Sequence, residues 1–212
     1  MKKIGIAVLA GAAFLTAACA DTHPTATSAD LAPSYARGDA GTSGNKLQCF
    51  AEDGASCSLI QNGASLNTTS GGYAGVYIGN SNLNGRLLSE INKFSFTYSG
   101  TGVTGGSPRI TFPIDIDGDG VTVYDGYDDY VTIDALGCGN GTATSGTVDP
   151  INNSSCMVSL NGGPTYANWA AFLAAYPNAR VASNLPFVIV DQPGQFTITN
   201  VQLGRGAAKS KG

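Results

Sequence analysis

The chain of 212 residues is almost without histidine, since its single imidazole belongs to His23. A Ser-His-Asp triad needs a histidine beside its nucleophile, and zinc sites commonly use histidine as a ligand. His23 falls in a segment rich in Thr, Ala, Ser and Pro, so we expect the folded part to contain neither arrangement. Most hydrolase mechanisms are thereby excluded.

Charge is sparse, and basic charge is the scarcer kind. Lys and Arg number 11 against 15 acidic residues, and 12% of all residues are charged. No Lys or Arg lies between Arg109 and Arg180, while seven of the acids fall within residues 115–134. Nucleic acid is therefore not an expected partner, because its recognition requires a basic surface.

Glutamate is scarce as well, with only Glu52 and Glu90 in the chain. A glycoside hydrolase works with two carboxylates and needs no histidine, so it is the enzymatic alternative that survives. Glu52 lies between Cys49 and Cys57, and Glu90 precedes an expected strand, where a solvated surface acid is the ordinary explanation. We expect a protein that is not an enzyme and has no catalytic residue.

One long apolar run is present, near the first residue. Lys2 and Lys3 precede an uncharged run from Ile4 to Ala18, the pattern of a secretory signal peptide. Its length of about 15 residues is short of the roughly 20 that span a bilayer. Ala18-Cys19-Ala20 fits an ordinary cleavage site, whereas Leu15-Thr16-Ala17-Ala18-Cys19 resembles the lipobox of bacterial lipoproteins, with threonine where an aliphatic residue is usual.

The lipobox resemblance implies that residues 1–19 form a signal peptide with a lipobox-like end and that Cys19 carries the lipid. The count of five cysteines agrees, because Cys19 is the odd one when the others pair. We therefore expect an exported protein of the bacterial cell envelope, held at a membrane by a lipid anchor. Free secretion is the alternative.

The other four cysteines form two close pairs in the sequence, Cys49 with Cys57 and Cys138 with Cys156. An exported chain meets an oxidising compartment, where such pairs become disulfides worth roughly 2–3 kcal/mol each. Local pairing is the economical choice among three, and free buried thiols are the alternative. Paired cysteines would leave no thiol nucleophile.

Composition divides the remaining chain into three parts. Residues 20–44 are rich in Thr, Ala, Ser, Pro and Gly without apolar periodicity, and predict a flexible tether. Residues 45–204, about 160 in number, suffice for one domain with a sizeable core. Residues 205–212 are small and basic and predict a disordered tail.

Within residues 45–204, short segments rich in Val, Ile, Thr, Tyr and Phe alternate with clusters of Gly, Asn, Ser and Asp. This pattern predicts an all-β fold, an antiparallel β-sandwich of the jelly-roll kind. The clearest strand is Ile91–Tyr98, in which aromatic residues alternate with mostly polar ones. The other expected strands are Leu47–Phe50, Ser56–Ile60, Gly75–Ile78, Arg109–Ile116, Tyr130–Ile133, Cys156–Leu160, Phe187–Val190 and Gln195–Leu203.

One segment, Tyr166–Tyr176, has apolar residues at helical spacing and predicts one short amphipathic helix. Thr165 is the expected cap at its start, and Pro177 prevents its continuation. The strands, an acidic turn and the final amphipathic strand Phe196–Leu203 resemble the galactose-binding-like and lectin-like jelly rolls of secreted bacterial proteins. This resemblance implies a fold and no particular ligand.

The acidic segment begins Asp115-Ile116-Asp117-Gly118-Asp119-Gly120 and resembles the first half of an EF-hand or dockerin calcium loop. The twelfth position of that motif holds Gly126 instead of an acid, and the flanks read as strands, so a site in a β-loop is expected. A solvated hairpin turn is the alternative, since Asp-Gly pairs suit tight turns. The candidate ligands of a structural calcium ion are Asp115, Asp117, Asp119, Val121, Asp125 and Asp128, which Asp129 or another loop would complete.

Three tyrosines, Tyr124, Tyr127 and Tyr130, interleave with these acids and are candidate ligand-binding residues. Their rings could stack on sugar rings while Asn and Asp bind the hydroxyl groups. Ordinary packing between strands is the alternative. Other aromatic residues that could join such a platform are Tyr73, Tyr77, Tyr98 and Trp169.

The sequence therefore favours an exported, non-catalytic β-sandwich that binds an extracellular glycan or another ligand. A structural or adhesive envelope protein with a calcium-stabilised loop is the first alternative, and its partner would be an envelope protein. A glycoside hydrolase is the second alternative.

Overall fold

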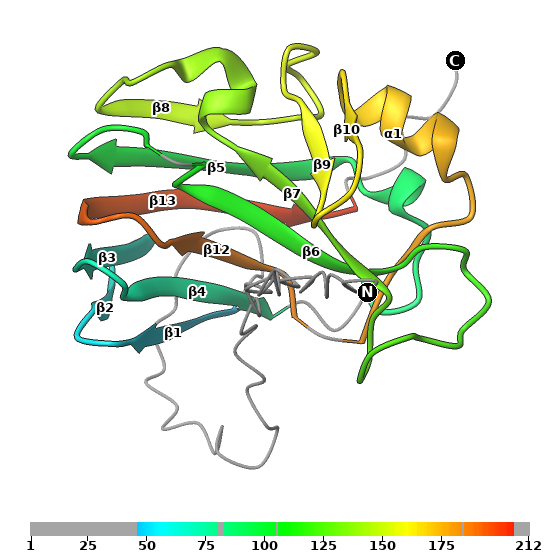
Figure 1. Cartoon of the computed structure of the whole chain (residues 1–212), viewed down its shortest axis with the longest axis horizontal. Helices are drawn as coiled ribbons and strands as arrows, with labels where there is room; N and C mark the ends of the chain where they lie inside the picture. Colours follow the sequence, from blue (N-terminus) through cyan, green and yellow to red (C-terminus); the bar gives the residue numbers. More distant parts are fainter. Residues whose placement is uncertain (1–45, 80–82, 105, 184, 206–212) are drawn as a thin grey trace, which may run out of the picture. The chain divides into compact units, whose positions relative to one another are not determined.

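The computed structural model describes residues 46–79, 83–104, 106–183 and 185–205, which form two antiparallel sheets packed as an open sandwich (Figure 1). The expected all-β fold class is confirmed. The signal peptide, Cys19, the segment 20–44 and the tail beyond Arg205 lie outside the described residues, so the predictions for them stay predictions. In the described part, no helix is long and apolar enough to cross a bilayer.

The larger sheet has eight strands in the order β1–β4–β12–β6–β7–β9–β10, and β11 also pairs with β6. Every neighbouring pair is antiparallel. The strands are β1 (Lys46–Glu52), β4 (Tyr73–Gly79), β6 (Arg109–Asp115), β7 (Asp129–Asp134), β9 (Val158–Leu160), β10 (Thr165–Tyr166), β11 (Arg180–Val181) and β12 (Phe187–Val190).

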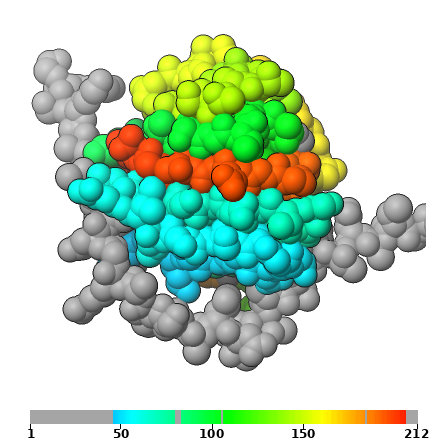
Figure 2. Space-filling view, turned by 90° about the vertical axis from the view of Figure 1, so that its left-hand side faces the viewer, coloured from blue at the N-terminus to red at the C-terminus, as the bar shows by residue number. Residues whose placement is uncertain are grey.

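The smaller sheet has five strands in the order β2–β3–β13–β5–β8. Figure 2 shows the same order from bottom to top as bands of cyan, red, green and yellow-green. The strands are β2 (Ser56–Ile60), β3 (Gly63–Thr68), β5 (Lys93–Gly100), β8 (Ser145–Val148) and β13 (Gly194–Gly204). The helical elements are η1 (Leu88–Glu90), η2 (Leu136–Asn140) and α1 (Trp169–Ala175).

The core lies between the two sheets and is rich in aromatic rings. In β5 the predicted alternation is confirmed, since Phe94, Phe96 and Tyr98 are all buried. The ring of Phe94 meets that of Phe112 edge-on at 4.3 Å, and Trp169 packs 5.5 Å from Phe94. Tyr98 and Trp169 were candidates for a surface platform, and that prediction is wrong because both side chains are buried in this core.

The α-helix α1, the one α-helix among the described residues, begins later than the sequence pattern suggested. Asn168 is its N-cap, because the Asn168 side chain accepts a hydrogen bond from the backbone N–H of Ala171. Thr165, the expected cap, instead lies in β10 and pairs with Ser159 of β9. The helix begins at Asn168 and not at Thr165, because asparagine caps a helix N-terminus at least as well as threonine. The helix ends before Pro177, as predicted.

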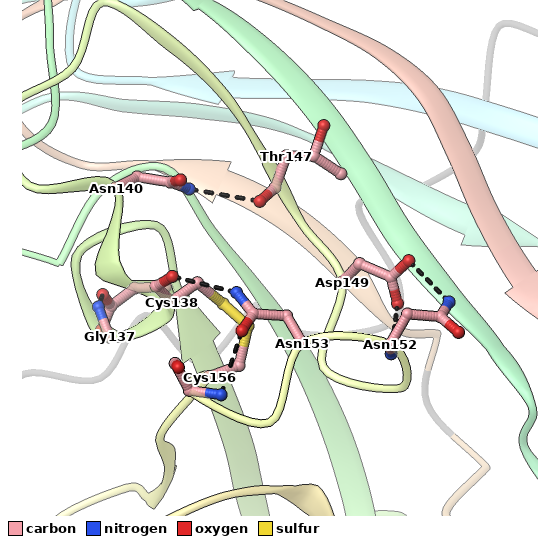
Figure 3. The surroundings of a disulfide bond; sticks show 10 residues. Gly137, Cys138, Asn140, Thr147, Asp149, Asn152, Asn153 and Cys156 are labelled. Carbon is pink, nitrogen blue, oxygen red and sulfur yellow. Dashed lines mark hydrogen bonds between the residues drawn. A yellow bond between two sulfur atoms is a disulfide. The ribbon is translucent and has the colours of Figure 1, made fainter.

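Both predicted disulfides are present. Cys49 of β1 is bonded to Cys57 of β2, which joins the larger sheet to the smaller one. Cys138 in η2 is bonded to Cys156, just before β9 (Figure 3). The side-chain amide of Asn153 donates to the Cys138 carbonyl at 3.0 Å and holds the same turn. Disulfides of this kind are typical of extracellular proteins.

Candidate functional site

The connection between β6 and β7, residues 116–128, folds around the carboxylate of Asp115. This side chain ends β6 on the outer face of the larger sheet and is only 6% exposed. Its two oxygens accept the backbone N–H groups of Gly118 and Gly120 at 2.7 and 3.0 Å. Gly118 has φ +75°, and a Cβ there would lie 2.2 Å from the Asn178 carbonyl, so only glycine fits the turn.

Asp128 closes the other end of the same loop. Its carboxylate accepts the N–H of Ile116 at 2.9 Å and that of Val123 at 2.8 Å. The backbone N–H of Asp128 in turn donates to the Ile114 carbonyl at 2.7 Å. Two aspartates therefore organise the loop from opposite ends through bonds to its backbone.

Three of the six predicted calcium ligands come together. Oxygen atoms of Asp115, Asp117 and Asp128 lie within 4.8 Å of one another. Asp119 is not part of this group, and its carboxylate accepts the Val121 N–H at 2.7 Å. Asp125 also lies outside this group of carboxylates, and the side chains of Val121 and Asp125 are both exposed.

A shallow hollow of about 420 Å³ lies beside this group. Asp129, which begins β7, forms part of its wall, and burial raises the pKa of this carboxyl although the Tyr130 N–H donates to it. The side chains of Val121 and Val123 are 73% and 79% exposed. The lining residues are Ile116, Asp117, Asp119, Val121, Thr122, Val123, Asp128 and Asp129.

Seven aromatic rings form a continuous line from this loop across the outer face of the larger sheet, and we call them the aromatic row. Consecutive centroids along the row lie 5.2, 4.4, 6.0, 6.0, 4.5 and 6.2 Å apart. Five of the seven residues come from β1, β4, β7 and β12, and the other two come from the loop. In order, the row consists of Tyr124, Tyr127, Tyr130, Phe187, Tyr77, Phe50 and Tyr73.

Strand alternation and sheet order produce the row. In β4, Ala74, Val76 and Ile78 point into the core, so Tyr73 and Tyr77 point outward. Phe187 pairs with Tyr77 across β12 and β4, and Phe50 lies opposite Gly75. A Cβ on Gly75 would come within 2.4 Å of the Phe50 ring, so this glycine lets the ring lie flat against the sheet.

The middle of the row bridges a strand. Tyr130 of β7 and Phe187 of β12 lie on either side of β6. The backbones of β7 and β12 are therefore about 9–10 Å apart, which is two strand spacings. The ring centroids of the two residues are nevertheless only 6.0 Å apart. The two rings therefore lean toward each other over β6. This explains why the outward-facing Thr111 is only 4% exposed and why its hydroxyl has no hydrogen-bond partner among the described residues.

Burial raises the pKa of three tyrosines of the row, Tyr73, Tyr77 and Tyr130. Burial, together with a hydrogen bond to Glu52, raises the pKa of Tyr73. Burial and then the negative charge of Glu52 raise the pKa of Tyr77. Burial and a hydrogen bond with Tyr127 raise the pKa of Tyr130. Most rings of the row are half-buried, and Tyr124 is its most exposed member at 57%.

The structure extends the set of aromatic residues that the sequence suggested. It brings the predicted Tyr124, Tyr127 and Tyr130 together in one row with Tyr73 and Tyr77, two of the four further residues that the sequence suggested. Sequence reasoning missed Phe50 and Phe187. A signal for Phe50 existed, since a disulfide from Cys49 to the other sheet turns its neighbour in the strand outward.

The two glutamates considered for catalysis have different partners. Glu52 is exposed on β1 and contacts Tyr73. Glu90 in η1 forms an ion pair with Arg205 at 3.2 Å. The structure therefore gives them no common site of the kind a glycosidase requires.

No protein-family model and no curated protein matches the chain. Among solved structures, the chain is similar to the family 11 carbohydrate-binding module of the cellulosomal cellulase Lic26A-Cel5E of Clostridium thermocellum. The two share 18% sequence identity with a TM-score of 0.39, over 78% of this chain and 97% of that one. A likeness of this size carries no functional argument.

Proposed function

We propose that this protein is a non-catalytic polysaccharide-binding domain and that the aromatic row is its binding surface. The observation that carries the proposal is the row itself, seven rings in contact across five neighbouring strands and the adjoining loop. Sugar rings present apolar C–H faces that pack on aromatic rings, and tyrosine hydroxyls can bond to sugar hydroxyls. An elongated row suits a chain of sugars better than a single one.

The rings of the row pack against one another and against the sheet, which favours binding. Each ring touches at least one other, and most of the rings are half-buried on paired strands. Immobilising a free side chain on binding costs about 0.5–1.5 kcal/mol, and a pre-ordered ring avoids most of that cost. The free energy of stacking is therefore retained as affinity.

The export signals suggest where this domain works. We propose that the signal peptide directs it to the cell envelope and that Cys19 holds it at a membrane by a lipid. Residues 20–44 would then separate the domain from the membrane by about 27 Å if they behave as a flexible coil. A tethered polysaccharide-binding surface would hold the cell to a glycan or a glycan to the cell.

Affinity electrophoresis tests the proposal. The folded protein is run through native gels that contain one neutral polysaccharide each, such as a β-glucan, xylan, mannan or chitin derivative. We expect retardation by at least one of them. Unchanged mobility in every gel, with a folded protein confirmed by circular dichroism, would contradict the proposal and favour an envelope protein as the partner.

We further propose that the β6–β7 loop binds a structural calcium ion, favoured by the close approach of Asp115, Asp117 and Asp128. Their backbone bonds leave lone pairs for a cation, since an ionised carboxylate accepts at about four sites. Calcium at about 100 times its Kd should stabilise the fold by about 2.7 kcal/mol and raise the Tm by several degrees.

The thermal test compares excess calcium with chelator. In Asp117→Asn the rise should largely disappear, because one of the three carboxylates is lost. The matched control is Asp53→Asn, an exposed acid outside the loop whose φ of +53° asparagine also tolerates. Equal Tm values with calcium and chelator in the unmodified protein would leave the loop as a turn held by its aspartates alone.

A further inference from the structure

We infer that the aromatic row prefers polysaccharides whose sugars carry free amino groups, such as glucosamine polymers, and rejects polymers of uronic or sulfated sugars. This inference rests on the proposed function and adds the charge of the ligand to it. Carboxylates flank both ends of the row, and the two arginines near it are engaged within the protein, while Lys46 of β1 is an exposed basic residue on the same face. A bound polymer therefore meets a negative potential at both ends.

Glu52 supplies the charge at the β1 end. It lies on the outer face directly opposite Tyr73 in the register of β1 and β4. The Tyr73 hydroxyl donates a hydrogen bond to its carboxylate, and the negative charge of that carboxylate also raises the pKa of Tyr77. Asp53 follows it, and both acids are exposed. The last ring of the row thus stands beside a carboxylate that a ligand can reach.

The β6–β7 loop supplies the charge at the opposite end. The carboxylate of Asp128 reaches the N–H of Val123, which directly precedes Tyr124, the first ring of the row. Asp117 and Asp119 stand exposed at the edge of the adjoining hollow. These acids lie in a stretch of 70 residues, 110–179, that contains no Lys or Arg.

Two arginines lie near the row or the loop, and both are occupied. Arg109, on the outer face of β6, forms an ion pair with Asp191 at 2.5 Å. Arg180 donates to the carbonyl oxygens of Gly118 and Gly85 at 3.3 and 2.8 Å. The charge of Arg109 is thereby neutralised by Asp191. Arg180 supplies one positive charge beside the loop, which is fewer than the negative charges of the loop's aspartates.

The expected preference is modest at each contact and accumulates along a polymer. An exposed ion pair contributes little alone, but a glucosamine chain presents an ammonium group on every sugar and can meet both ends of the row. We expect the amino polymer to bind about fivefold to tenfold more tightly than its neutral counterpart at low salt. The difference should shrink near 1 M salt, where the screening length is about 3 Å.

The experiment uses three oligosaccharides of equal length: a glucosamine oligomer, its fully N-acetylated form and a uronate oligomer. Binding to the full chain is measured by calorimetry at about pH 5.5–6, where amino groups are protonated and most carboxylates are ionised. Chelator is present throughout, so that calcium neither neutralises the carboxylates of the loop nor bridges the uronate to them. The expected order is free amine first, N-acetylated second and no detectable binding of the uronate.

Two variants localise the effect. Glu52→Gln should reduce the preference for the free amine about twofold to threefold, because it removes one end charge and keeps a hydrogen-bonding side chain beside Tyr73. Glu90→Gln, which changes the other glutamate at its ion pair with Arg205, should leave the preference unchanged.

Different results would contradict the charge preference and the proposed polysaccharide binding. Equal binding of the free and acetylated oligomers, or a preference that high salt leaves intact, would overturn the charge preference while the polysaccharide site stands. Tight uronate binding would overturn it as well. Absence of binding for these oligomers and for every neutral polysaccharide would remove the proposed function itself.

Discussion

Replacing Tyr127 with alanine is expected to weaken polysaccharide binding about tenfold while leaving the fold intact. Tyr127 joins the loop part of the row to the sheet part, with ring centroids 5.2 Å from Tyr124 and 4.4 Å from Tyr130. Its loss removes one stacking surface and frees two neighbouring rings, which together cost about 1–2 kcal/mol of binding free energy. The backbone bond from the Tyr124 N–H to the Tyr127 carbonyl remains possible in the variant.

Two control variants accompany this measurement by calorimetry or affinity electrophoresis. Tyr127→Phe keeps the ring and should retain most of the affinity. Met157→Ala removes an apolar side chain that is 48% exposed but lies outside the row, and it should bind as the unmodified protein does. Unchanged affinity in Tyr127→Ala, or an equal loss in Met157→Ala, would contradict the assignment of the row.

Phe112→Ala is expected to destabilise the fold by about 3–5 kcal/mol. Phe112 is fully buried in β6, near the middle of the larger sheet, where its ring meets Phe94 at 4.3 Å and lies 6.5 Å from Trp169. Removing the ring loses these contacts and leaves a cavity that paired strands cannot readily close. Urea unfolding at equilibrium measures the change, with an unaltered m-value showing that the unfolded state is the same.

The control variant for Phe112→Ala changes a residue on the other face of the larger sheet. Thr132→Ala changes a half-exposed outward residue of the neighbouring strand β7 and should cost less than about 1 kcal/mol. If Phe112→Ala cost no more than Thr132→Ala, the aromatic cluster between the sheets would not be the main support of the sandwich.

Strands with strong alternation could be predicted from the sequence, and weaker ones could not. The β5 segment shows its buried face directly, because Phe94, Phe96 and Tyr98 alternate with polar residues. β3 and β8 have few large apolar residues and are strands because their neighbours in the smaller sheet pair with them. β10 and β11 are two residues each, too short for any periodicity to appear.

The members of the acidic group in the β6–β7 loop could be predicted only in part from the spacing of the aspartates. The alternation of Asp115, Asp117 and Asp119 suggested a common cation site. The structure instead groups Asp115 and Asp117 with Asp128, because both ends of the loop are tied by carboxylates to backbone N–H groups. Which acid turns toward a neighbour and which toward its own backbone depends on turn geometry that the spacing does not contain.

The aromatic row depends on contacts between distant strands and was predictable only in part. The spacing of three between Tyr124, Tyr127 and Tyr130 is visible in the sequence. Phe187 sits in an apolar run, Phe-Val-Ile-Val, whose two faces look alike until β12 is placed between β4 and β6. The row therefore requires the strand order of the larger sheet, which one sequence does not reveal.

Binding of polysaccharide by the aromatic row is tested most directly by an NMR titration of protein with isotope-labelled tyrosine and phenylalanine rings. A soluble oligosaccharide that retards the protein in gels serves as the ligand. We expect shifts for the ring signals of Tyr77, Tyr127 and Tyr130, and none for the buried Tyr98 or for Tyr166 near α1. Saturable binding that shifts Tyr166 and leaves the row unchanged would contradict the claim.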